Sequence, residues 1–560
     1  MNKLFLIWLC LLQCVASVTF AQPGFDKVYS FSPYPSFTVF SDIRMVLPDT
    51  QKIIMVGETI SDTVGNANES ILLGASDYTG NLIWKKNLSF SAPQYRRNAP
   101  GFLHSLIKAA PNLYVLGGNG YDCETLPECH PRPFIYIFNG NGDSLRFQAM
   151  PYQANQNVFF LNSLVLDRQK NIVSAGSFWN NTFGDTMAVW LSKFDSAGNF
   201  KWRKVIADTP SFRGSQCFRV LNANENNGYL LTGIAMHPDS TYKTSYCFWR
   251  TDTAGNVLWR RHLPKPPGWV SDDVYANEAG TDIIPANNGS GYYFMTTAPS
   301  RVQFPGEPPS YRVVYFCGNI DNEANVVWAK TYERDTLHME SSWGIAQKTN
   351  GDLVFMGNSS GIWSQEEQYG ISLFSTDSMG NVKWMRQLRR YTCTFPIGQK
   401  MRSLKIAPNG ALVMGGTIFQ SSPSPGCYDT ADAIGWLVLT DSLGRRNATD
   451  TATYPLYADS VIFPVDTTTS VRLLPGMQGA QLRLFPNPAT DKTYLELVQF
   501  AGNTNDVQCS LYDQTGRLLQ QRNMTNHKEA LDLSGYSPGL YFIRLRYQQQ
   551  EMGTVKVMKR

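Results

Sequence analysis

The chain has 560 residues, which is long enough for more than one domain and for a large buried core. Its charges nearly balance, with 49 Lys and Arg against 45 Asp and Glu, and no basic run stands out. This excludes proteins that bind nucleic acid or anionic membranes through excess positive charge, so no nucleic acid is expected as a partner. Aromatic residues, together with Gly, Asn, Ser and Thr between short apolar runs, favour strands and turns over helices.

Residues 1–21 have the features of a secretory signal peptide. Lys3 supplies the positive charge, "LFLIWLCLLQCV" forms the apolar stretch, and small residues precede a cleavage point between Ala21 and Gln22. A lipoprotein signal at Cys14 is disfavoured by the Gln before it. The apolar run is short for the roughly 20 residues that cross a bilayer, so no transmembrane segment is expected and the protein leaves the cytoplasm.

One pattern then recurs seven times between the signal peptide and residue 447. Each copy holds an acidic turn followed by a strand, as in "DYTGNLIWKK" and "DTAGNVLWRR", and these turns begin at residues 77, 139, 195, 252, 321, 377 and 441. The first residue of the turn can cap its own backbone, and the Gly three positions later can take a positive φ. In the fifth copy Ala324 replaces this Gly, which predicts a strained or differently shaped turn.

Three short apolar runs precede each turn, so every copy predicts a unit of four strands. Four-stranded units repeated radially form a β-propeller, and the sequence predicts seven blades over residues 22–447. A Trp follows most of the turns, and we expect it to pack one sheet against the next, burying about 200 Å² each time. These residues are Trp84, Trp202, Trp259, Trp328 and Trp384. A ladder that stacks carbohydrate is the disfavoured alternative.

The two ends of the propeller region complement each other. The seventh turn is not followed by an aromatic outgoing strand, whereas "FDKVYSFS" at Phe25–Ser32 resembles the outgoing strand "WKKNLSFS" at 84–91 and has no partner of its own. The N-terminal strand is therefore predicted to complete the seventh blade and close the ring.

Eight cysteines remain after signal cleavage, and an exported chain permits disulfides. Cys123 and Cys129 flank a short Pro-containing loop and form the best candidate pair, with Cys393 and Cys427 as a second candidate. Cys509 alternates with Val and Leu in "VQCSLYD", which predicts a buried thiol. No CxxC occurs, so zinc and redox chemistry have little support.

Four long insertions rich in Pro and aromatic residues are the candidate binding loops. They span residues 119–132, 260–280, 298–312 and 419–430. Trp269, Tyr275 and Tyr311 are the candidate contacts to a glycan or a protein ligand, although the same side chains can close the loops on themselves.

Catalytic and metal-binding patterns are weak. Ser359 in "GNSSG" satisfies G-x-S-x-G, but the motif ends a predicted strand and no helix follows it, so a nucleophile is not expected. The six histidines show no metal-binding pair. We therefore assign no catalytic residue, no metal ligand and no cofactor.

The repeat resembles the tryptophan-motif propellers of quinoprotein dehydrogenases and outer-membrane assembly proteins, and more loosely kelch-like domains. The shared feature is the acidic-Gly turn followed by Trp, over residues 25–447. The quinoprotein resemblance implies a quinone cofactor, but the adjacent cysteine pair of those enzymes is absent here. The resemblance supports the architecture and leaves the activity open.

Composition changes after residue 447. Residues 448–481 are rich in Thr, Asp and Pro and are predicted to form a linker. Residues 482–560 contain alternating strands with hairpin turns at "DQTG" and "YSPG", which predict a small β-sandwich.

This last segment resembles the type A C-terminal sorting domain of cargo of the type IX secretion system. The matching residues are Pro486, Asn487, Pro488, Gly516, Gly539, Tyr541, Lys556 and Lys559. The resemblance implies Sec export to the periplasm, passage through the type IX machinery, and removal of the domain by a sortase-like peptidase. The product would stay on surface lipopolysaccharide or enter the medium. A generic sandwich of fibronectin or carbohydrate-binding type is the alternative.

Taken together, these features predict a secreted or surface-displayed all-β protein, a seven-bladed propeller followed by a small β-sandwich, that binds or scaffolds other molecules. The alternative is a secreted enzyme that degrades polysaccharide or peptide at the propeller face. Two carboxylates within roughly 5–10 Å of each other in a cleft would favour the enzyme.

Overall fold

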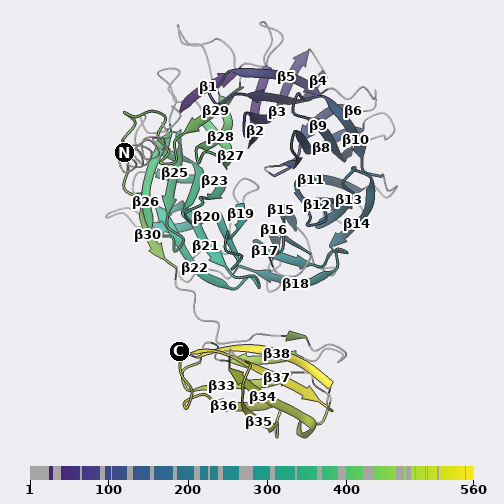
Figure 1. The fold of residues 1–560 in the computed structure, drawn as a ribbon, viewed down its shortest axis with the longest axis vertical. Helices are drawn as coiled ribbons and strands as arrows, with labels where there is room; N and C mark the ends of the chain where they lie inside the picture. Colours follow the sequence, from purple (N-terminus) through teal and green to yellow (C-terminus); the bar gives the residue numbers. More distant parts are fainter. Residues whose placement is uncertain are drawn as a thin grey trace, which may run out of the picture. The chain divides into compact units, whose positions relative to one another are not determined.

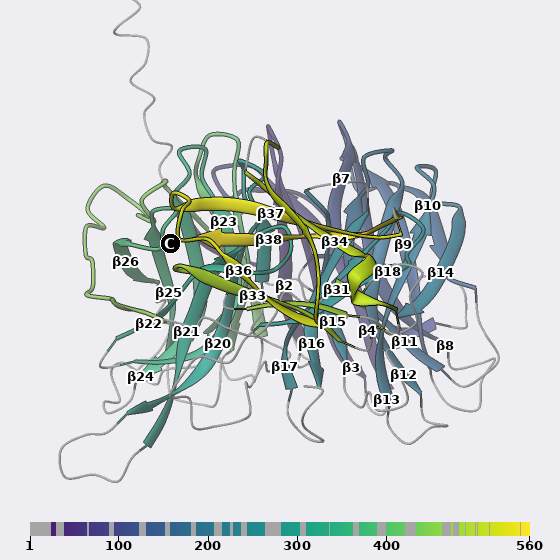
Figure 2. The ribbon, with the colours of Figure 1, turned by 90° about the horizontal axis from the view of Figure 1, so that it is seen from below.

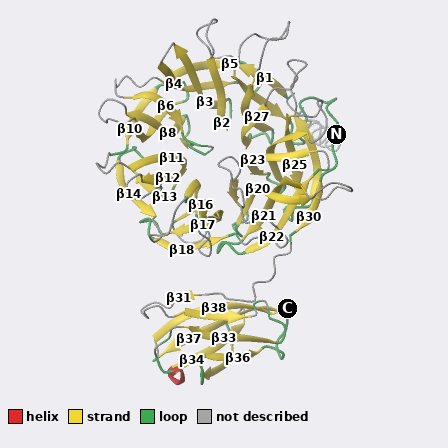
Figure 3. Ribbon diagram, turned by 180° about the vertical axis from the view of Figure 1, so that it is seen from behind, coloured by secondary structure: helices red, strands yellow, loops and turns green. Residues whose placement is uncertain are grey.

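The structure is a computed structural model, and its contacts divide into two units, Met1–Val461 and Ile462–Arg560. The described residues are 24–29, 39–63, 66–88, 95–102, 104–122, 130–151, 157–180, 186–206, 215–224, 228–236, 244–263, 282–302, 310–334, 337–361, 369–388, 399–419, 433–461, 472–473, 481–485, 487, 489–498, 500, 502–513, 516–548 and 550–559. Strands make up nearly all of the regular structure in both units, as predicted (Figure 3).

The first unit is a β-propeller. Its described strands pair into sheets of four, nine, four, four, five and four strands, which follow one another around a ring (Figure 1). We divide the nine-stranded sheet where β4 and β6 pair through Glu69 and Arg97 alone, and we number the resulting groups of strands as blades. In each blade the first strand is innermost, and the strands run along the ring axis (Figure 2). All-β propeller architecture is therefore confirmed.

The strand bounds follow blade by blade. Blade 1 holds β2 (Val39–Pro48), β3 (Ile53–Thr63), β4 (Asn66–Ser76) and β5 (Leu82–Leu88); blade 2 holds β6 (Tyr95–Pro100), β7 (Leu106–Ala110), β8 (Leu113–Asp122), β9 (His130–Asn139) and β10 (Ser144–Ala149). Blade 3 holds β11 (Asn157–Leu166), β12 (Ile172–Asn180), β13 (Thr186–Phe194) and β14 (Phe200–Ile206); blade 4 holds β15 (Gln216–Asn222), β16 (Tyr229–Met236), β17 (Thr244–Thr251) and β18 (Val257–His262).

The remaining blades complete the ring. Blade 5 holds β19 (Asp282–Pro285), β20 (Tyr292–Val302), β21 (Ser310–Ile320) and β22 (Val326–Glu333); blade 6 holds β23 (Leu337–Gln347), β24 (Leu353–Gly361), β25 (Tyr369–Thr376) and β26 (Val382–Leu388). Blade 7 holds β27 (Gln399–Ile406), β28 (Leu412–Phe419), β29 (Ala433–Thr440) and β1 (Phe25–Tyr29).

The N-terminal strand closes the ring, as predicted. β1 pairs antiparallel with β29 along its whole length, from Phe25 opposite Leu439 to Tyr29 opposite Gly435. The Trp436 indole Nε1 donates to Asp26 Oδ1 at 2.7 Å, which ties the two ends of the propeller sequence together. Blade 7 therefore has no bare outer edge at β29, where unpaired backbone groups would invite aggregation.

The acidic turns share one hydrogen-bonded geometry. In the turn from Asp195 to Asn199, Asp195 Oδ1 accepts the amides of Ala197 and Asn199 at 3.1 and 2.7 Å, and Gly198 has φ +83°. The turn that carries Ala324 keeps the same backbone bonds, with Ala324 at φ 60°. The sequence predicts either a strained turn or a differently shaped one, and the turn is strained. Ala324 has a positive φ, which only Gly adopts without a steric cost.

Each outgoing strand packs on the acidic turn of the following blade. Trp84 of β5 lies against Gly142 in blade 2, where an added Cβ would be 2.7 Å from the indole, and Trp84 Nε1 donates to the Gly140 carbonyl at 3.0 Å. Trp202, Trp328 and Trp384 contact the turn glycines 255, 380 and 444 in the same way. These four indoles confirm the predicted packing between sheets.

Other residue types take this position where Trp is absent. Phe25 packs on Gly80 across the closure between blades 7 and 1, and the Arg146 side chain packs on Gly198 between blades 2 and 3. Trp259, which precedes the turn with Ala324, is half-buried and lies under the guanidinium of Arg261, 5.5 Å from its ring centroid. The buried apolar clusters accordingly lie between neighbouring blades.

Residues 449–461, which we call the strap, differ from the predicted linker. Arg386 of blade 6 donates to the carbonyls of Asp450 and Ala452 at 3.0 and 2.8 Å, and β30 (Tyr457–Ser460) pairs with β22 at the outer edge of blade 5. Tyr454 and Leu456 pack against the buried cluster between blades 5 and 6. The linker prediction is wrong for this part, because the exposed edges of the blades bind its backbone.

The second unit contains two four-stranded sheets. One has the order β31 (Arg472–Leu473), β32 (Gln481–Phe485), β33 (Lys492–Val498), β36 (Lys528–Asp532); the other has the order β35 (Leu518–Asn523), β34 (Val507–Asp513), β37 (Gly539–Tyr547), β38 (Gln550–Lys559), and a single 3-10 turn, η3 (Thr504–Asp506), precedes β34. One buried cluster fills the space between the sheets and includes Cys509, a free thiol as predicted.

Removing β1 tests the closure. Deleting Phe25–Tyr29 should lower the melting temperature of the propeller by on the order of 10 °C, because β29 loses its partner and the contact of Phe25 with Gly80 disappears. Tryptophan fluorescence follows the propeller alone, since residues 482–560 contain no Trp. Val28→Thr, at an exposed position of the same strand, should leave the melting curve unchanged. An unshifted curve for the deletion would show that β1 does not close the ring.

A pair of glycine substitutions isolates the contact between blades. Gly255→Ala should cost about 3 kcal/mol, because it combines positive-φ strain with a clash against Trp202, whose ring atoms are the nearest to the added Cβ. Gly410→Ala should cost only about 1 kcal/mol from strain, since Gly410 has a similar φ but nothing within 4 Å of the added Cβ. Urea unfolding monitored by tryptophan fluorescence gives both values, and equal costs would contradict the packing role of the indole.

Candidate functional site: the ring axis

A β-bulge recurs halfway along the innermost strands. The register shifts between Ile43 and Met45, between Leu161 and Ser163, between Cys217 and Arg219, between Ser342 and Gly344, and between Met401 and Ser403. The bulged residues are Arg44, Asn162, Phe218, Trp343 and Arg402. A bulge re-aims one side chain without ending the strand, so five blades present an extra side chain at the same level of the ring.

Blade 2 has a larger insertion at this level. The Gly101 amide donates to the Gly117 carbonyl at 2.8 Å, and the Gly117 amide donates to the Ser105 carbonyl at 2.7 Å. β6 and β7 are thus two halves of one innermost strand. Phe102 and His104 lie between these halves, and we call these two residues the plug.

The plug meets residues from blades on the other side of the ring. The Phe102 ring lies 6.3 Å from the Phe218 ring of blade 4 and 6.1 Å from the Trp343 ring of blade 6, centroid to centroid. Blades 2, 4 and 6 are not neighbours, so these aromatic side chains meet on the ring axis. An aromatic cluster therefore occupies the centre of the propeller at the level of the bulges.

A buried ionic cluster lies beside these rings. His104 Nε2 is 2.9 Å from Asp282 Oδ1, and the same carboxylate pairs with the Arg219 guanidinium. Asp282 also accepts the backbone amides of Ile283 and Ile345 at 2.7 and 3.0 Å. One carboxylate at the start of β19 therefore connects blades 2, 4, 5 and 6.

Burial and the neighbouring charges set the protonation states of this cluster. Burial lowers the pKa of His104 to about 3, and the nearby Arg219 adds to this effect, so the imidazole is neutral at neutral pH. Burial alone would raise the pKa of Asp282, but Arg219 and His104 together hold it well below its usual range. Burial, followed by Arg219, lowers the pKa of Lys405 to about 8.

A second group of charges lies in blade 1, and a cation–aromatic contact links blades 6 and 7. Arg44 Nε lies 3.0 Å from Asp42 Oδ2, and its guanidinium also pairs with Glu58 on the adjacent strand. The Arg402 guanidinium lies 5.4 Å from the centroid of the Trp343 ring. Two carboxylates thus share one guanidinium. Among the described residues, this arrangement most resembles the pair of acid and base groups of a hydrolase.

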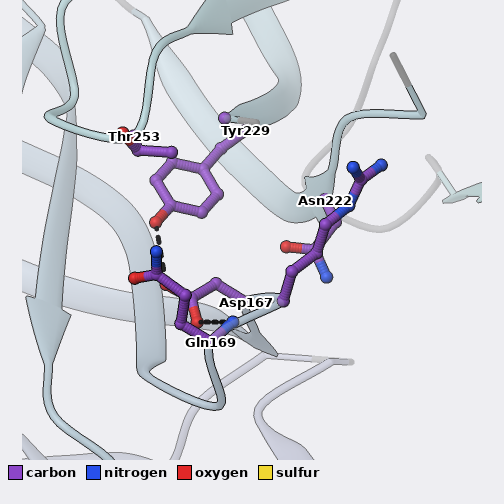
Figure 4. Close-up of a pocket in the computed structure, with 7 residues that line it drawn as sticks. Asp167, Gln169, Asn222, Tyr229 and Thr253 are labelled. Atoms are coloured by element: carbon purple, nitrogen blue, oxygen red, sulfur yellow. Dashed lines mark hydrogen bonds between the residues drawn. The ribbon is translucent and has the colours of Figure 1, made fainter. Parts of the chain in front are cut away.

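A small polar pocket lies at the acidic-turn end of blades 3 and 4 (Figure 4). It is lined by Asp167, Arg168, Gln169, Asn222, Gly228, Tyr229 and Thr253. Asp167 Oδ2 accepts from Lys193 Nζ at 2.8 Å and from Tyr229 Oη at 3.3 Å, while Oδ1 accepts the Gln169 amide at 2.9 Å. Burial would raise the pKa of Asp167, but Lys193 and Asn171 lower it. The Asp167 carboxylate is therefore bound by other residues of the protein, and it links blades 3 and 4.

Most of the predicted site residues do not enter these clusters. Ala21, Gln22, Cys123, Cys129, Trp269, Tyr275, Pro486 and Pro488 lie outside the described residues, as do Cys393 and Cys427. Tyr311 belongs to β21, where its backbone pairs with Arg301. Ser359 is buried in β24, and its hydroxyl donates to the Gly370 carbonyl and accepts from Ser372, which gives it a structural role.

The sorting-motif residues have distinct positions in the second unit. Asn487 Nδ2 donates to the Lys556 carbonyl at 2.8 Å, and Lys559 is buried, with its ammonium bonded to the carbonyls of Ser534 and Tyr536. Tyr541 Oη donates to the Ser537 carbonyl at 2.6 Å. Gly516 and Gly539 have φ +83° and +156°.

The plug and Asp282 were missed by the sequence analysis. An alignment of the innermost strands carries the signal: "HSLIKA", "NSLVLD" and "RSLKIA" place Ser at the position where "TDIIPA" has Asp282 and "FRVLNA" has Arg219. The plug has its own signature, because "GFLHS" puts a Gly and then Phe, Leu and His ahead of that Ser.

Comparisons with known proteins identify the second unit. Residues 483–560 match the family model of the secretion system C-terminal sorting domain, which confirms the predicted resemblance to type IX sorting domains. No curated protein matches the chain. In the described residues, no helix is long and apolar enough to cross a membrane.

Solved structures similar to the chain are distant. A protein of unknown function from Dyadobacter fermentans is 9% identical, with a TM-score of 0.40, over 74% of this chain and 97% of that one. The β-propeller domain of the Trilobed protease from Pyrococcus furiosus is 10% identical, with a TM-score of 0.30, over 71% and 95%. A puromycin-hydrolyzing peptidase from Mycobacterium tuberculosis is 12% identical, with a TM-score of 0.35, over 72% and 63%.

The buried imidazole predicts acid sensitivity. Because the pKa of His104 is lower in the folded protein than in the unfolded chain, the unfolded chain binds the extra proton between about pH 6.5 and 3. Stability should therefore fall on acidification through this window, with His104 adding up to about 1.4 kcal/mol per pH unit. His104→Gln should remove this part of the slope in urea unfolding at a series of pH values. Parallel slopes for both proteins would contradict the burial of a neutral His104.

Proposed function

We propose that this propeller-fold cargo protein of the type IX secretion system is a binding or scaffold protein of the cell exterior. Export delivers the propeller to the outside of the cell, where it is released or attached to surface lipopolysaccharide after a sortase-like peptidase removes the sorting domain. The propeller then binds a glycan or a protein ligand.

The observation that carries this proposal is the occupied ring axis. A propeller enzyme needs reactive groups that face substrate, whereas Asp282 is bound by His104, Arg219 and two backbone amides. Phe102 fills the neighbouring space with aromatic contacts. Asp282 and the groups that bind it are thus engaged in holding blades together.

Ligand contact is assigned to the face opposite the acidic turns. The insertions at 119–132, 260–280, 298–312 and 419–430 join the ends of β8 and β9, β18 and β19, β20 and β21, and β28 and β29. All four junctions lie at the ends of the strands away from the acidic turns, because the turns occupy the other ends. Long loops on one face of a rigid scaffold are a common arrangement for recognition.

A screen of the purified full-length protein against glycans and envelope proteins tests the proposal. We expect a ligand whose binding falls at least tenfold in Trp269→Ala/Tyr275→Ala. Ile83→Ala, an exposed apolar residue on an outgoing strand, is the control and should bind normally. Binding that is insensitive to the loop substitutions would contradict the assigned face.

A secreted hydrolase is the second candidate, because Asp42 and Glu58 share the Arg44 guanidinium. Paired carboxylates supply an acid and a base for cleavage of glycosidic bonds. Turnover of polysaccharide or peptide substrates that disappears in both Asp42→Asn and Glu58→Gln would favour this candidate over the binding protein. Turnover unaffected by either substitution would exclude this pair as its site.

A further inference from the structure

One lysine interrupts a ring of apolar side chains on the innermost strands. The residue that follows the bulge, or its counterpart in blades 2 and 5, marks one level of this ring. Two residues further along the strand, six blades have an apolar residue and blade 7 has Lys405, as "NSLVLD" and "RSLKIA" illustrate. The apolar residues at this position are Leu47, Ile107, Val165, Leu221, Ile284 and Ala346. Lys405 therefore stands where the repeat otherwise places an apolar residue.

Side chains at this position face the inside of the ring. Five of the six apolar residues pack against the buried clusters between neighbouring blades and stay partly exposed, while Leu221 is buried. Lys405 lies on the same face of β27 as Ser403, whose hydroxyl accepts the Val46 amide of blade 1 at 3.2 Å. Because the innermost strands carry all of these residues, their exposed atoms face the ring axis.

The Lys405 ammonium reaches the ionic cluster on the axis. It interacts electrostatically with Arg219 and Asp282, which belong to blades 4 and 5 and not to a neighbour of blade 7. Burial lowers the pKa of Lys405 to about 8, which still leaves the group mainly protonated at neutral pH. A side chain that is desolvated and yet partly exposed lies in accessible space within the ring.

This cluster has more positive than negative charge. Arg219 and Lys405 are cations, Asp282 is the carboxylate that they share, and His104 is neutral at neutral pH. Asp282 is already bound by Arg219, by His104 and by two backbone amides. Within the described part of the chain, Lys405 makes no hydrogen bond or ion pair, and the Arg219 guanidinium is bound through Nη1 alone. Donors of both cations therefore remain available to a ligand.

A stabilising contact does not explain the charge of Lys405. Lys193, another partly buried cation between blades, has such a contact, because its ammonium lies 2.8 Å from Asp167 Oδ2 and 3.1 Å from Tyr229 Oη. A cation that is removed from water without a bonded partner lowers stability. An apolar residue would avoid this cost, as it does at the same position in the other six blades. A lysine that lowers stability on the axis indicates a ligand.

We propose that Lys405 and Arg219 bind a small organic carboxylate on the ring axis, beside the plug. The ammonium and the two unbound guanidinium nitrogens would donate charge-assisted hydrogen bonds to the carboxylate. The hydrocarbon part of the ligand would contact the ring of apolar side chains at the level of Lys405. Inorganic phosphate offers the charge without the apolar surface, so it should bind more weakly. The site is separate from the loops to which the proposed function assigns glycan or protein binding.

Calorimetric titration of the purified full-length protein at pH 7 and constant ionic strength tests the site. Hexanoate should bind at least tenfold more tightly than inorganic phosphate, and hexanamide, which has the same hydrocarbon but no charge, should not bind. Lys405→Leu should weaken hexanoate binding at least tenfold. Lys85→Leu is the matched control, because it removes the same charge from an exposed position of β5, and it should bind hexanoate like the unchanged protein.

Urea unfolding followed by tryptophan fluorescence distinguishes a binding role from a structural one. Without ligand, Lys405→Leu should unfold at the same urea concentration as the unchanged protein or at a higher one, and hexanoate should stabilise only the unchanged protein. A lower midpoint for Lys405→Leu without ligand would show that the ammonium holds the propeller together, which overturns the proposal. Undiminished hexanoate binding by Lys405→Leu would also overturn it, as would an unchanged protein that binds no hexanoate or binds phosphate equally well.

Discussion

The contact between one blade's outgoing side chain and the next blade's acidic turn holds the propeller together. A flat indole covers the turn glycine, and in the contacts of Trp84 and Trp328 the indole nitrogen also donates to a carbonyl of that turn. A side chain on the turn would occupy the space of the ring, so the Gly and the Trp depend on each other. This explains why the acidic turn and the Trp recur together along the sequence.

Charged residues add a second bond at the same junction. Lys86, Lys204 and Lys330 each donate from the outgoing strand to the last residue of the next acidic turn, at 2.7, 2.6 and 2.8 Å. In the last turn this residue is Arg445, and Arg386 bonds instead to the Leu443 carbonyl and to the strap. The strap thus attaches at the junction where the last residue of the acidic turn is Arg445.

The sequence predicts the repeating parts of the fold well, because they are local. The acidic turn, the alternation of the strands and the unmatched N-terminal strand all appear within short windows, and the closure by β1 follows from them. The burial of Cys509 follows from alternation in the same way. Periodic patterns of this kind are the most dependable signals in a single sequence.

The plug and the strap could not be predicted in this way, because their stability comes from distant residues. Phe102 is held by rings from two other blades, and Asp282 lies more than 60 positions from Arg219 and further from His104. The strap has the composition of a linker, yet β22 and Arg386 bind its backbone. Backbone hydrogen bonds do not depend on side-chain identity, so composition does not reveal them.

Two parts of the chain thus have separate tasks. The sorting domain directs export, and the propeller forms a ring on whose axis its own described side chains meet.

The closed ring is the central claim, and native-state hydrogen exchange tests it most directly. If β1 completes blade 7, the amides of β1 and β29 should exchange as slowly as the amides of β13 and β14 in blade 3, because no local opening exposes them. Fast exchange confined to β1 and β29 would contradict the closed ring, since it would show that the two ends separate while the other blades stay folded.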